Sequence, residues 1–220
     1  MKKILFLFAA FAFIANASAQ KCTDGNCFDG IGTFVWANGD VYQGSFKNGD
    51  LNGIGSFKTS RGDTYNGSFV DGKFDGKGVF VWITGSSFSG NFTAGKKNGF
   101  GTFTFANGDK FEGNYLDNKF HGEGTYRWSS GTVYTGNWKN GVQDGQGKMT
   151  YKTGGSYEGE WANGVRHGQG VYTTSNGSKQ IGEFVNGKFT NGEFISKNGK
   201  ERIVYKDGRP ASTATAGNKK

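Results

Sequence analysis

Hydrophobic and polar residues alternate in short segments along most of this chain, and glycine-containing turns separate the segments. Residues 42–46 (YQGSF) carry aromatic side chains at both ends with glycine between them, and residues 53–57 (GIGSF) alternate in the same way. A two-residue period is typical of a β-strand. Asn48-Gly49 lies between the two segments and is a strong signal for a tight hairpin turn. The pattern therefore predicts strands joined as β-hairpins.

The hairpin pattern recurs every 23 residues without a gap. Each unit reads aromatic-x-Gly-x-aromatic, then Gly, then Gly-x-Gly-x-aromatic, then Gly, and the units begin at Tyr42, Tyr65, Phe88, Phe111, Tyr134 and Tyr157. A half unit precedes these six, and a degenerate unit with Gln180 in place of the aromatic residue follows them. Degenerate ends are typical of a capped repeat array. We expect an N-terminal cap and half repeat in residues 20–40, six repeats in 41–178, a degenerate repeat in 179–199 and a basic, partly disordered tail in 200–220.

The glycines inside the strands suggest how the strands pair. If Phe46 faces Gly55 and Gly44 faces Phe57, every ring covers the bare backbone of a neighbouring strand. The other face of the strands is mostly Ser, Thr, Asn, Gln, Lys and Glu. The sequence thus predicts an all-β fold, a single elongated and twisted antiparallel sheet of stacked β-hairpins, with one aromatic face and one polar face. At roughly 4.8 Å per strand, about fifteen strands would make a ribbon about 70 Å long.

Composition excludes the main alternatives to this fold. The 220 residues include 40 glycines and only one proline, and aromatic residues make up 16%. Glycine disfavours helices, the aromatic content is too high for a disordered chain, and collagen would need glycine at every third position together with abundant proline.

The 23-residue pattern YxGxFxxGxxxGxGxF resembles the MORN (membrane occupation and recognition nexus) repeat, and the resemblance covers about residues 28–195. It implies stacked hairpins in one extended sheet and roles in protein–protein contact, dimerisation and, in some members, phospholipid binding. The CTDGNCFDGIGTF opening also resembles exported bacterial proteins of this type. Some relatives carry kinase or methyltransferase domains, but only about 25 residues follow the repeats here.

The first nineteen residues have the features of a signal peptide. Two lysines precede an apolar run, and Ala17-Ser18-Ala19 gives the small-x-small pattern of a cleavage site between Ala19 and Gln20. Because Gln20-Lys21 precedes the first cysteine, a lipoprotein anchor is not expected. We therefore expect an exported protein without a lipid anchor, located in a periplasm, at the envelope or outside the cell.

Export also bears on the two cysteines, Cys22 and Cys27. In an oxidising compartment, an even pair this close is interpreted as a disulfide. A redox or metal pair is the alternative, but it would need CxxC spacing or additional ligands. We expect no cofactor and no metal.

Charge is concentrated at the C-terminal end of the chain. The formal charge is +8, and it falls to +6 once the two lysines of the signal peptide are removed. Residues 20–187 hold 16 basic and 15 acidic side chains, whereas residues 188–220 hold 8 and 3. A nearly neutral body does not suit nucleic-acid binding. The one basic cluster, a candidate for phospholipid contact, is formed by Lys200, Arg202, Lys206 and Arg209.

Catalytic chemistry has little support in the sequence. His121 and His167 are two repeats apart, which places them four strands or roughly 19 Å from each other. Asp40, Asp63 and Asp109 each follow a turn glycine and are interpreted as turn-closing residues. A catalytic site needs convergent titratable groups, so we expect a protein that is not an enzyme.

The aromatic face is the candidate binding surface, because one sheet has no second layer to cover it. One row, two residues beyond the last pattern aromatic of each unit, contains Trp36, Trp82, Phe105, Trp128 and Tyr151. These residues either pack on Tyr42, Tyr65 and their equivalents as a thin core, or form a groove for an extended peptide, a glycan or a second copy of the chain. The function we expect is a protein-interaction scaffold or binding module at the cell envelope, with a homodimer through the C-terminal unit as one form of it. Phospholipid binding through the repeats or the basic tail is the alternative, and glycan binding a further one.

Overall fold

The computed structural model describes residues 20–215, and every regular element in that range is a β-strand. The predicted signal peptide, including Ala19, lies outside the described residues, as do residues 216–220. The strands are β1 (Lys21–Gly25), β2 (Gly30–Val35), β3 (Val41–Lys47), β4 (Asp50–Lys58), β5 (Thr64–Val70), β6 (Lys73–Val81), β7 (Ser87–Thr93), β8 (Lys96–Thr104), β9 (Lys110–Leu116), β10 (Lys119–Arg127), β11 (Val133–Lys139), β12 (Val142–Thr150), β13 (Ser156–Ala162), β14 (Val165–Thr173), β15 (Lys179–Val185), β16 (Lys188–Ile195), β17 (Glu201–Lys206) and β18 (Arg209–Thr215).

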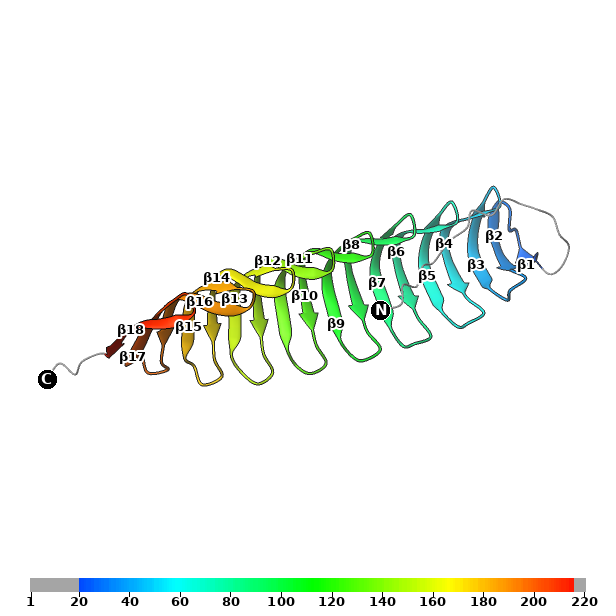
Figure 1. Ribbon diagram of the computed structural model, residues 1–220. Helices are drawn as coiled ribbons and strands as arrows, with labels where there is room; N and C mark the ends of the chain where they lie inside the picture. Colours follow the sequence, from blue (N-terminus) through cyan, green and yellow to red (C-terminus); the bar gives the residue numbers. More distant parts are fainter. Residues whose placement is uncertain (1–19, 216–220) are drawn as a thin grey trace.

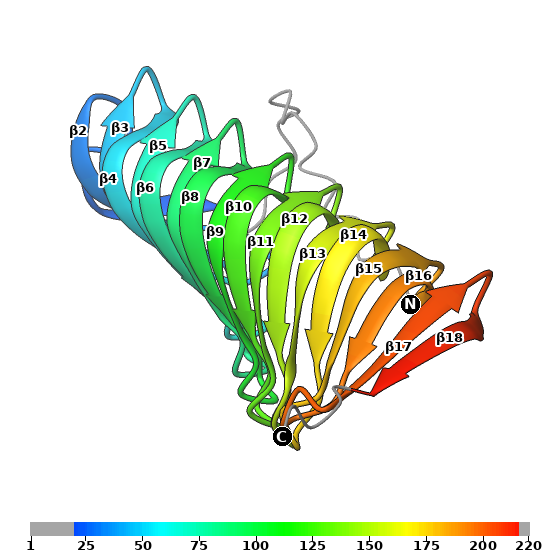
Figure 2. The same cartoon turned by 90° about the vertical axis from the view of Figure 1, so that its left-hand side faces the viewer.

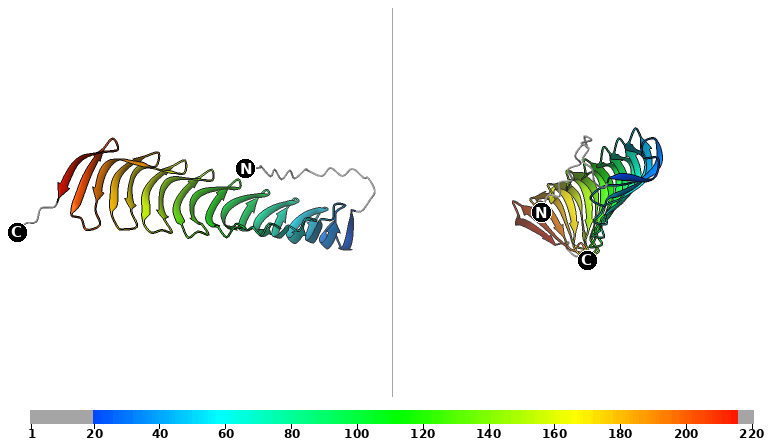
Figure 3. Two further views of the ribbon diagram at one scale, coloured as in Figure 1. Left: turned by 60° about the horizontal axis from the view of Figure 1, so that its bottom comes forward. Right: turned by 90° about the vertical axis from the view of Figure 1, so that its right-hand side faces the viewer.

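All 18 strands belong to one antiparallel sheet, in which each strand pairs with the next along the chain. The sheet is a long, twisted ribbon with the described N-terminal strands at one end and the C-terminal strands at the other (Figures 1 and 3). Viewed along its length, the strands are arched (Figure 2). The predicted fold class is therefore confirmed.

The predicted strand register is wrong. Gly44 lies opposite Gly55 and Tyr42 opposite Phe57, rather than glycine opposite an aromatic residue. The link to the next hairpin continues the same pairing, with Gly55 opposite Gly67. A row of paired glycines therefore crosses the sheet and is flanked by rows of rings.

The turn between the two strands of a hairpin determines this register. Asn48 and Gly49 both have positive φ angles, 52° and 81°, as a two-residue type I′ turn requires. Lys47 consequently pairs with Asp50 and Phe46 with Leu51. The strands then shift register between Gly44 and Phe46, and Gly53, at φ 84°, lies in the longer strand at the shift. A tight turn followed by a bulge thus brings glycine opposite glycine.

The prediction that every ring covers glycine holds only for the first aromatic ring of each repeat, which lies along its own strand. A Cβ atom on Gly101 would stand 2.5 Å from Cζ of Phe88, and one on Gly90 2.6 Å from the same atom. Where the ring is tyrosine, its hydroxyl extends further, and Tyr42 donates to the carbonyl oxygen of Ser45 at 2.9 Å. Glycine is therefore needed at these positions for the space that it leaves, since Gly90 and Gly101 do not have positive φ angles.

The core is a chain of interlocked rings within this single sheet. The first aromatic residue of each repeat makes edge-to-face contacts with two rings. One is the ring four residues later, and the other is the counterpart of that second ring in the next repeat. Tyr42 lies 5.1 Å from Phe46 and 5.0 Å from Phe69, and the chain runs unbroken to Phe184. Tyr42 and Tyr65 have no exposed surface. The aromatic face is thus its own core, and only its two margins remain partly accessible.

The C-terminal segment differs from the expected partly disordered tail. Residues 201–206 and 209–215 form β17 and β18, and Phe194 pairs with Ile203. The alternation of Ile203 and Tyr205 continues the strand pattern, and the ring of Tyr205 lies 5.4 Å from that of Phe189. Asp207 and Gly208, at φ 51° and 74°, repeat the two-residue turn. The sheet therefore continues through the basic cluster.

Candidate binding surface

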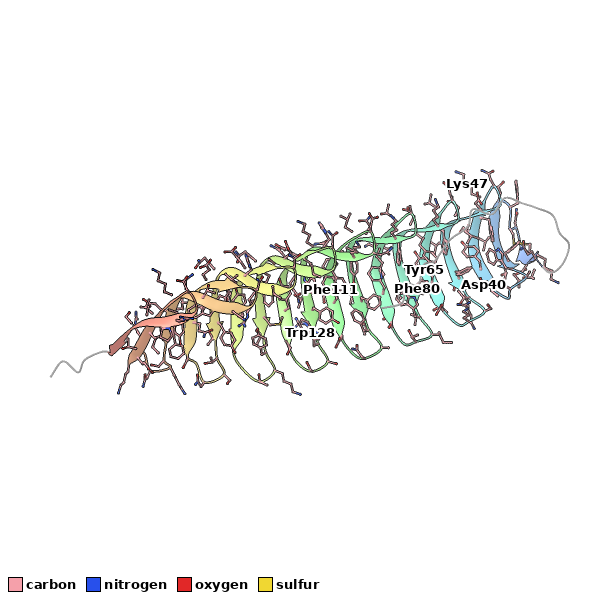
Figure 4. The ribbon with its side chains drawn as sticks, in the orientation of Figure 1. Asp40, Lys47, Tyr65, Phe80, Phe111 and Trp128 are labelled. Atoms are coloured by element: carbon pink, nitrogen blue, oxygen red, sulfur yellow. A yellow bond between two sulfur atoms is a disulfide. The ribbon has the colours of Figure 1, made fainter. Side chains whose placement is uncertain are left out.

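The five candidate binding residues lie in one row along an edge of the aromatic face, here called the outer row: Trp36, Thr59, Trp82, Phe105, Trp128, Tyr151 and Thr174. Figure 4 shows Trp128 and Asp40 at this edge, Lys47 at the opposite edge, and Tyr65, Phe80 and Phe111 between them. The aromatic members of the row are half-buried. They are neither fully exposed nor sealed in the core.

The outer row packs against the last pattern aromatic of each repeat, and its members Trp36, Trp82, Trp128 and Tyr151 also pack against the core cluster that contains Tyr42 and Tyr65. Trp82 lies 4.4 Å from Phe80 and 5.3 Å from Phe103. The contacts continue through Phe105 to Trp128, which lies 4.5 Å from Tyr126. The outer row and the last pattern aromatic of each repeat thus form a strip of packed, partly exposed rings, here called the ledge.

The turns behind the outer row are tied to one another by aspartate. Asp63 accepts the backbone N–H of Ile83 at 2.8 Å, and Asp109 accepts that of Ser129 at 2.8 Å, in each case from the next repeat. Asp40 accepts the N–H of Ser60 in the same way. The hydrogen bond from Ser129 lowers the pKa of Asp109. These aspartates close turns, as the sequence predicts, and also hold successive turns in register.

A second margin, the inner row, lies beside the two-residue turns and contains Leu51, Phe74, Lys97, Phe120, Gln143, Arg166 and Phe189. Two of its members are cations, which the sequence reasoning missed. The signal was available, because aligning the repeats puts both in a column otherwise made mostly of leucine and phenylalanine.

Lys97 stands in a cage of rings. Its Nζ lies 4.8 Å from the ring centroid of Phe103 and 5.5 Å from those of Trp82 and Phe88, with Tyr115 at 5.9 Å. Burial lowers the pKa of Lys97 to about 8. The ring faces partly compensate for the lost hydration of the ammonium.

Arg166 borders a hollow on the same face. Its guanidinium lies 5.1 Å from the ring of Tyr172, and Nη2 donates to the carbonyl oxygen of Gly187 at 2.7 Å. The hollow has a volume of ≈ 440 Å³, and Met149, Tyr151 and Trp161 also line it. Met149 lines the hollow at a position where most other repeats have a phenylalanine or tyrosine ring.

The two histidines occupy a turn-supporting position. Asp75, at the equivalent position of an earlier repeat, accepts the backbone N–H of Ala94 at 3.0 Å. His121 is partly buried and its Nδ1 has no partner among the described residues, while the backbone oxygen of His167 accepts from Tyr157. No group of three or more His, Cys, Asp or Glu side chains in residues 20–215 is placed to hold a metal ion.

The polar face carries the ion pairs and isolated apolar residues. Lys148 pairs with Glu158 at 2.9 Å, and both side chains are exposed. Phe100 is 53% exposed on this face. An open hollow of ≈ 820 Å³, with Glu112 and Glu123 among its lining residues, lies over β8 to β13.

The candidate lipid-contact residues lie at the C-terminal end of the sheet. Arg202 and Lys206 alternate onto the polar face of β17, and Lys206 pairs with Arg209 across the turn. Arg202 lies 3.5 Å from Glu193. Lys200 is exposed in the turn before β17. Three of the four cations therefore share one end of one face.

The two cysteines are joined as a disulfide, with a Cα–Cα distance of 5.8 Å. The bridge closes the segment between β1 and β2, and Sγ of Cys27 lies 3.4 Å from the carbonyl oxygen of Thr33. The N-terminal edge of the sheet is thereby fixed to its neighbour.

The MORN repeat model matches seven consecutive segments, residues 28–41, 42–64, 65–87, 88–110, 111–133, 134–156 and 157–179. The chain belongs to the MORN repeat family. The match ends at residue 179, so the degenerate unit and the strands that follow lie beyond it. MORN repeats suggest a binding or scaffold role for this chain.

Among solved structures, this MORN-repeat chain is similar to the TCP domain of SAS-4 (dCPAP) of Drosophila melanogaster, solved in complex with a proline-rich motif of Ana2. The identity is 13%, the match covers 80% of this chain and 99% of that one, and the TM-score is 0.46. The TCP10 domain of Danio rerio CPAP matches at 13% identity, 90% and 94% coverage and a TM-score of 0.48. Virginiamycin B lyase from Staphylococcus aureus matches at 8% identity, 91% and 89% coverage and a TM-score of 0.20. TM-scores below 0.5 assign no function to the chain. No curated protein matches it.

A membrane-spanning helix is not among the described elements: residues 20–215 contain no helix that is long and apolar enough to cross a bilayer.

Proposed function

We propose that this MORN-repeat protein is a non-enzymatic, exported scaffold that binds a protein partner along its aromatic face. The observation that carries the proposal is the ledge of half-buried rings formed by the outer row and the pattern aromatics beside it. Fixed aromatic side chains bind with little loss of conformational entropy. Partly exposed, contiguous apolar surface is typical of interaction sites.

A selection from a phage-displayed library of random peptides tests this function. Peptides selected on residues 20–220 should lose binding to a Trp128→Thr variant, because threonine is the natural residue of the outer row at positions 59 and 174. A Phe100→Gln variant is the matched control, since it removes a ring from the polar face. Glutamine is the natural residue at the equivalent position two repeats later, Gln146. Loss of binding in the control alone, or in neither variant, would place the binding surface elsewhere.

Phospholipid contact is the alternative function, and the shared position of Arg202, Lys206 and Arg209 favours it. Co-sedimentation with phosphatidylglycerol and phosphatidylcholine vesicles at low and high salt tests it. Truncation before residue 200 would remove two strands of the sheet, so Lys206→Gln and Arg209→Gln are the appropriate variants. Salt-sensitive binding that these variants abolish would support lipid contact at the C-terminal end.

Export and self-association complete the proposal. The predicted cleavage between Ala19 and Gln20 is tested by the N-terminal residue and mass of the protein recovered outside the cytoplasm. A homodimer through the C-terminal edge is suggested by β18, which pairs on one side only within residues 20–215. Light scattering coupled to size exclusion measures this association directly.

A further inference from the structure

The inner row contains two cations at positions that favour apolar side chains. Lys97 and Arg166 are three repeats apart in sequence, which corresponds to six strands and about 29 Å across the sheet at ~4.8 Å per strand. Leu51, Phe74 and Phe120 fill the same position in other repeats. Neither charge is therefore required by the fold of a repeat.

Both cations lack an acidic partner among the described residues. The ion pairs there involve Lys96, Lys110, Lys148 and Arg202, all with exposed side chains. Four ring faces lie 4.8–5.9 Å from the ammonium of Lys97. A half-buried cation without a counter-ion loses hydration that the rings only partly replace.

Hydrogen-bond donors remain unused at both places. Arg166 has five N–H donors, and one of them bonds to the carbonyl oxygen of Gly187. Beside the cage of Lys97, the buried hydroxyl of Tyr115 has no partner among residues 20–215. Each place offers a positive charge, free donors and apolar walls.

The surroundings of Arg166 also leave room for a ligand. The hollow of ≈ 440 Å³ is lined by Met149, Tyr151, Trp161 and Tyr172, with the arginine at its border. An apolar side chain fits against the rings, and a carboxylate fits the planar fork of the guanidinium. The combination favours an apolar chain that carries negative charge.

We propose that the partner of the aromatic face is an acidic, apolar polypeptide segment, with one carboxylate bound by Arg166 at the hollow and a second bound by Lys97. This inference rests on the proposed function and adds the chemistry of the partner to it. An extended segment crossing from one cation to the other needs about nine residues at ~3.3 Å each. Apolar side chains between the two carboxylates pack on the rings of Phe120 and its neighbours.

The test uses a fluorescent synthetic peptide with two glutamates spaced to match this distance on one side of an extended chain and leucines on that same side between them. A second peptide has glutamine in place of both glutamates. The chain should bind the glutamate peptide at least about tenfold more tightly, the size expected for one charge-assisted hydrogen bond. Lys97→Leu and Arg166→Gln should each weaken binding by a similar factor. Both substitutions borrow residues of the same inner row, Leu51 and Gln143, so the repeats keep a natural side chain.

Matched controls remove the same charges from the polar face. Lys139→Leu and Arg127→Gln, at exposed positions, should leave the affinity for the glutamate peptide unchanged. Equal binding of the two peptides, equal loss in controls and inner-row variants, or no binding of the glutamate peptide would each overturn the inference.

The outcomes separate the inference from the proposed function. If library-selected peptides still depend on Trp128 while the glutamate and glutamine peptides bind alike, a protein-binding face remains and its acidic preference is wrong. Phosphatidylglycerol vesicles form a further arm: vesicle binding that depends on Lys97 and Arg166, without peptide binding, would overturn the inference in favour of an anionic lipid surface.

Discussion

The glycine row makes a sharp prediction for a Gly101→Ala variant. The added Cβ would stand 2.5 Å from Cζ and 2.6 Å from Cε2 of Phe88. That ring has no exposed surface and makes edge-to-face contacts with Phe92 and Tyr115 at 5.1 Å each. It has no free space to move into, so the strain is not relieved by a side-chain rotation.

Inserting one carbon into a tightly packed core destabilises by about 1–3 kcal/mol, and we expect the upper part of this range at Gly101. Gly101 does not have a positive φ angle, so the penalty is steric. Gly95 is the matched control: its φ is 83°, and no atom would lie within 4 Å of an added Cβ. Gly95→Ala should lose only the conformational term, about 1 kcal/mol.

Equilibrium urea unfolding followed by tryptophan fluorescence measures both variants, and a Phe88→Leu background completes the cycle. Leucine removes the atoms that the new Cβ would meet, so Gly101→Ala should lose most of its effect there, with a coupling of about 1–2 kcal/mol. The same loss in both backgrounds would show that the ring does not require the glycine, and the explanation of the glycine row would be wrong.

Three further substitutions test other features. Lys97→Leu should raise the free energy of unfolding at neutral pH by about 1–2 kcal/mol. Burial lowers the pKa of Lys97 from 10.5 to about 8, which corresponds to a cost of roughly 3 kcal/mol for keeping the buried ammonium charged, and the rings offset part of that cost. Between about pH 8 and 10.5, Lys97 is protonated in the unfolded chain but not in the folded one, so the wild type becomes more stable as the pH rises. The stability difference between Lys97→Leu and the wild type should therefore shrink over this range, and a pH-independent difference would contradict burial of the charge as its cause. Ala94→Asn should raise the free energy of unfolding by about 0.5–1 kcal/mol, and with it the urea midpoint, because Ala94 has a φ of 48° in a turn position that favours asparagine. An unchanged or lower midpoint would show that the turn tolerates alanine without strain. A Cys22→Ser, Cys27→Ser variant should lose about 2 kcal/mol in β1 and β2 alone, and hydrogen exchange that also accelerates in the central strands would refute a local role.

The sequence predicts what local chemistry decides. Strand alternation, the turn at Asn48-Gly49 and the polar face are local patterns, and the structure reproduces them. The register is not local: it depends on the shift near Gly53, which nothing in the alternation reveals. The continuation of the sheet through Tyr205 was missed because charged residues flank the short apolar run of Ile203, Val204 and Tyr205, although Ile203 and Tyr205 continue the two-residue period of the core face.

The candidate binding surface likewise has features that the sequence predicts and others that it does not. The outer row, including Trp82 and Trp128, could be predicted from spacing, because its rings recur at a fixed distance from the pattern. Its packing against the last pattern aromatic of each repeat could not, since that follows from the register. Lys97 and Arg166 occupy a position that most repeats fill with an apolar side chain. Alternation alone counts them as ordinary polar residues, whereas alignment of the repeats distinguishes them and the structure shows the rings around them.

The ring chain and the aspartate bonds each reach only the next repeat, as those from Tyr42 to Phe69 and from Asp63 to Ile83 show. Length is therefore a variable that gene duplication can change in steps of one unit, about 10 Å for two strands. Removing a unit between Lys97 and Arg166 would shorten their spacing by one such step while leaving each local environment intact. If a partner binds both cations as proposed, the number of repeats between them sets the spacing of the carboxylates that this partner needs.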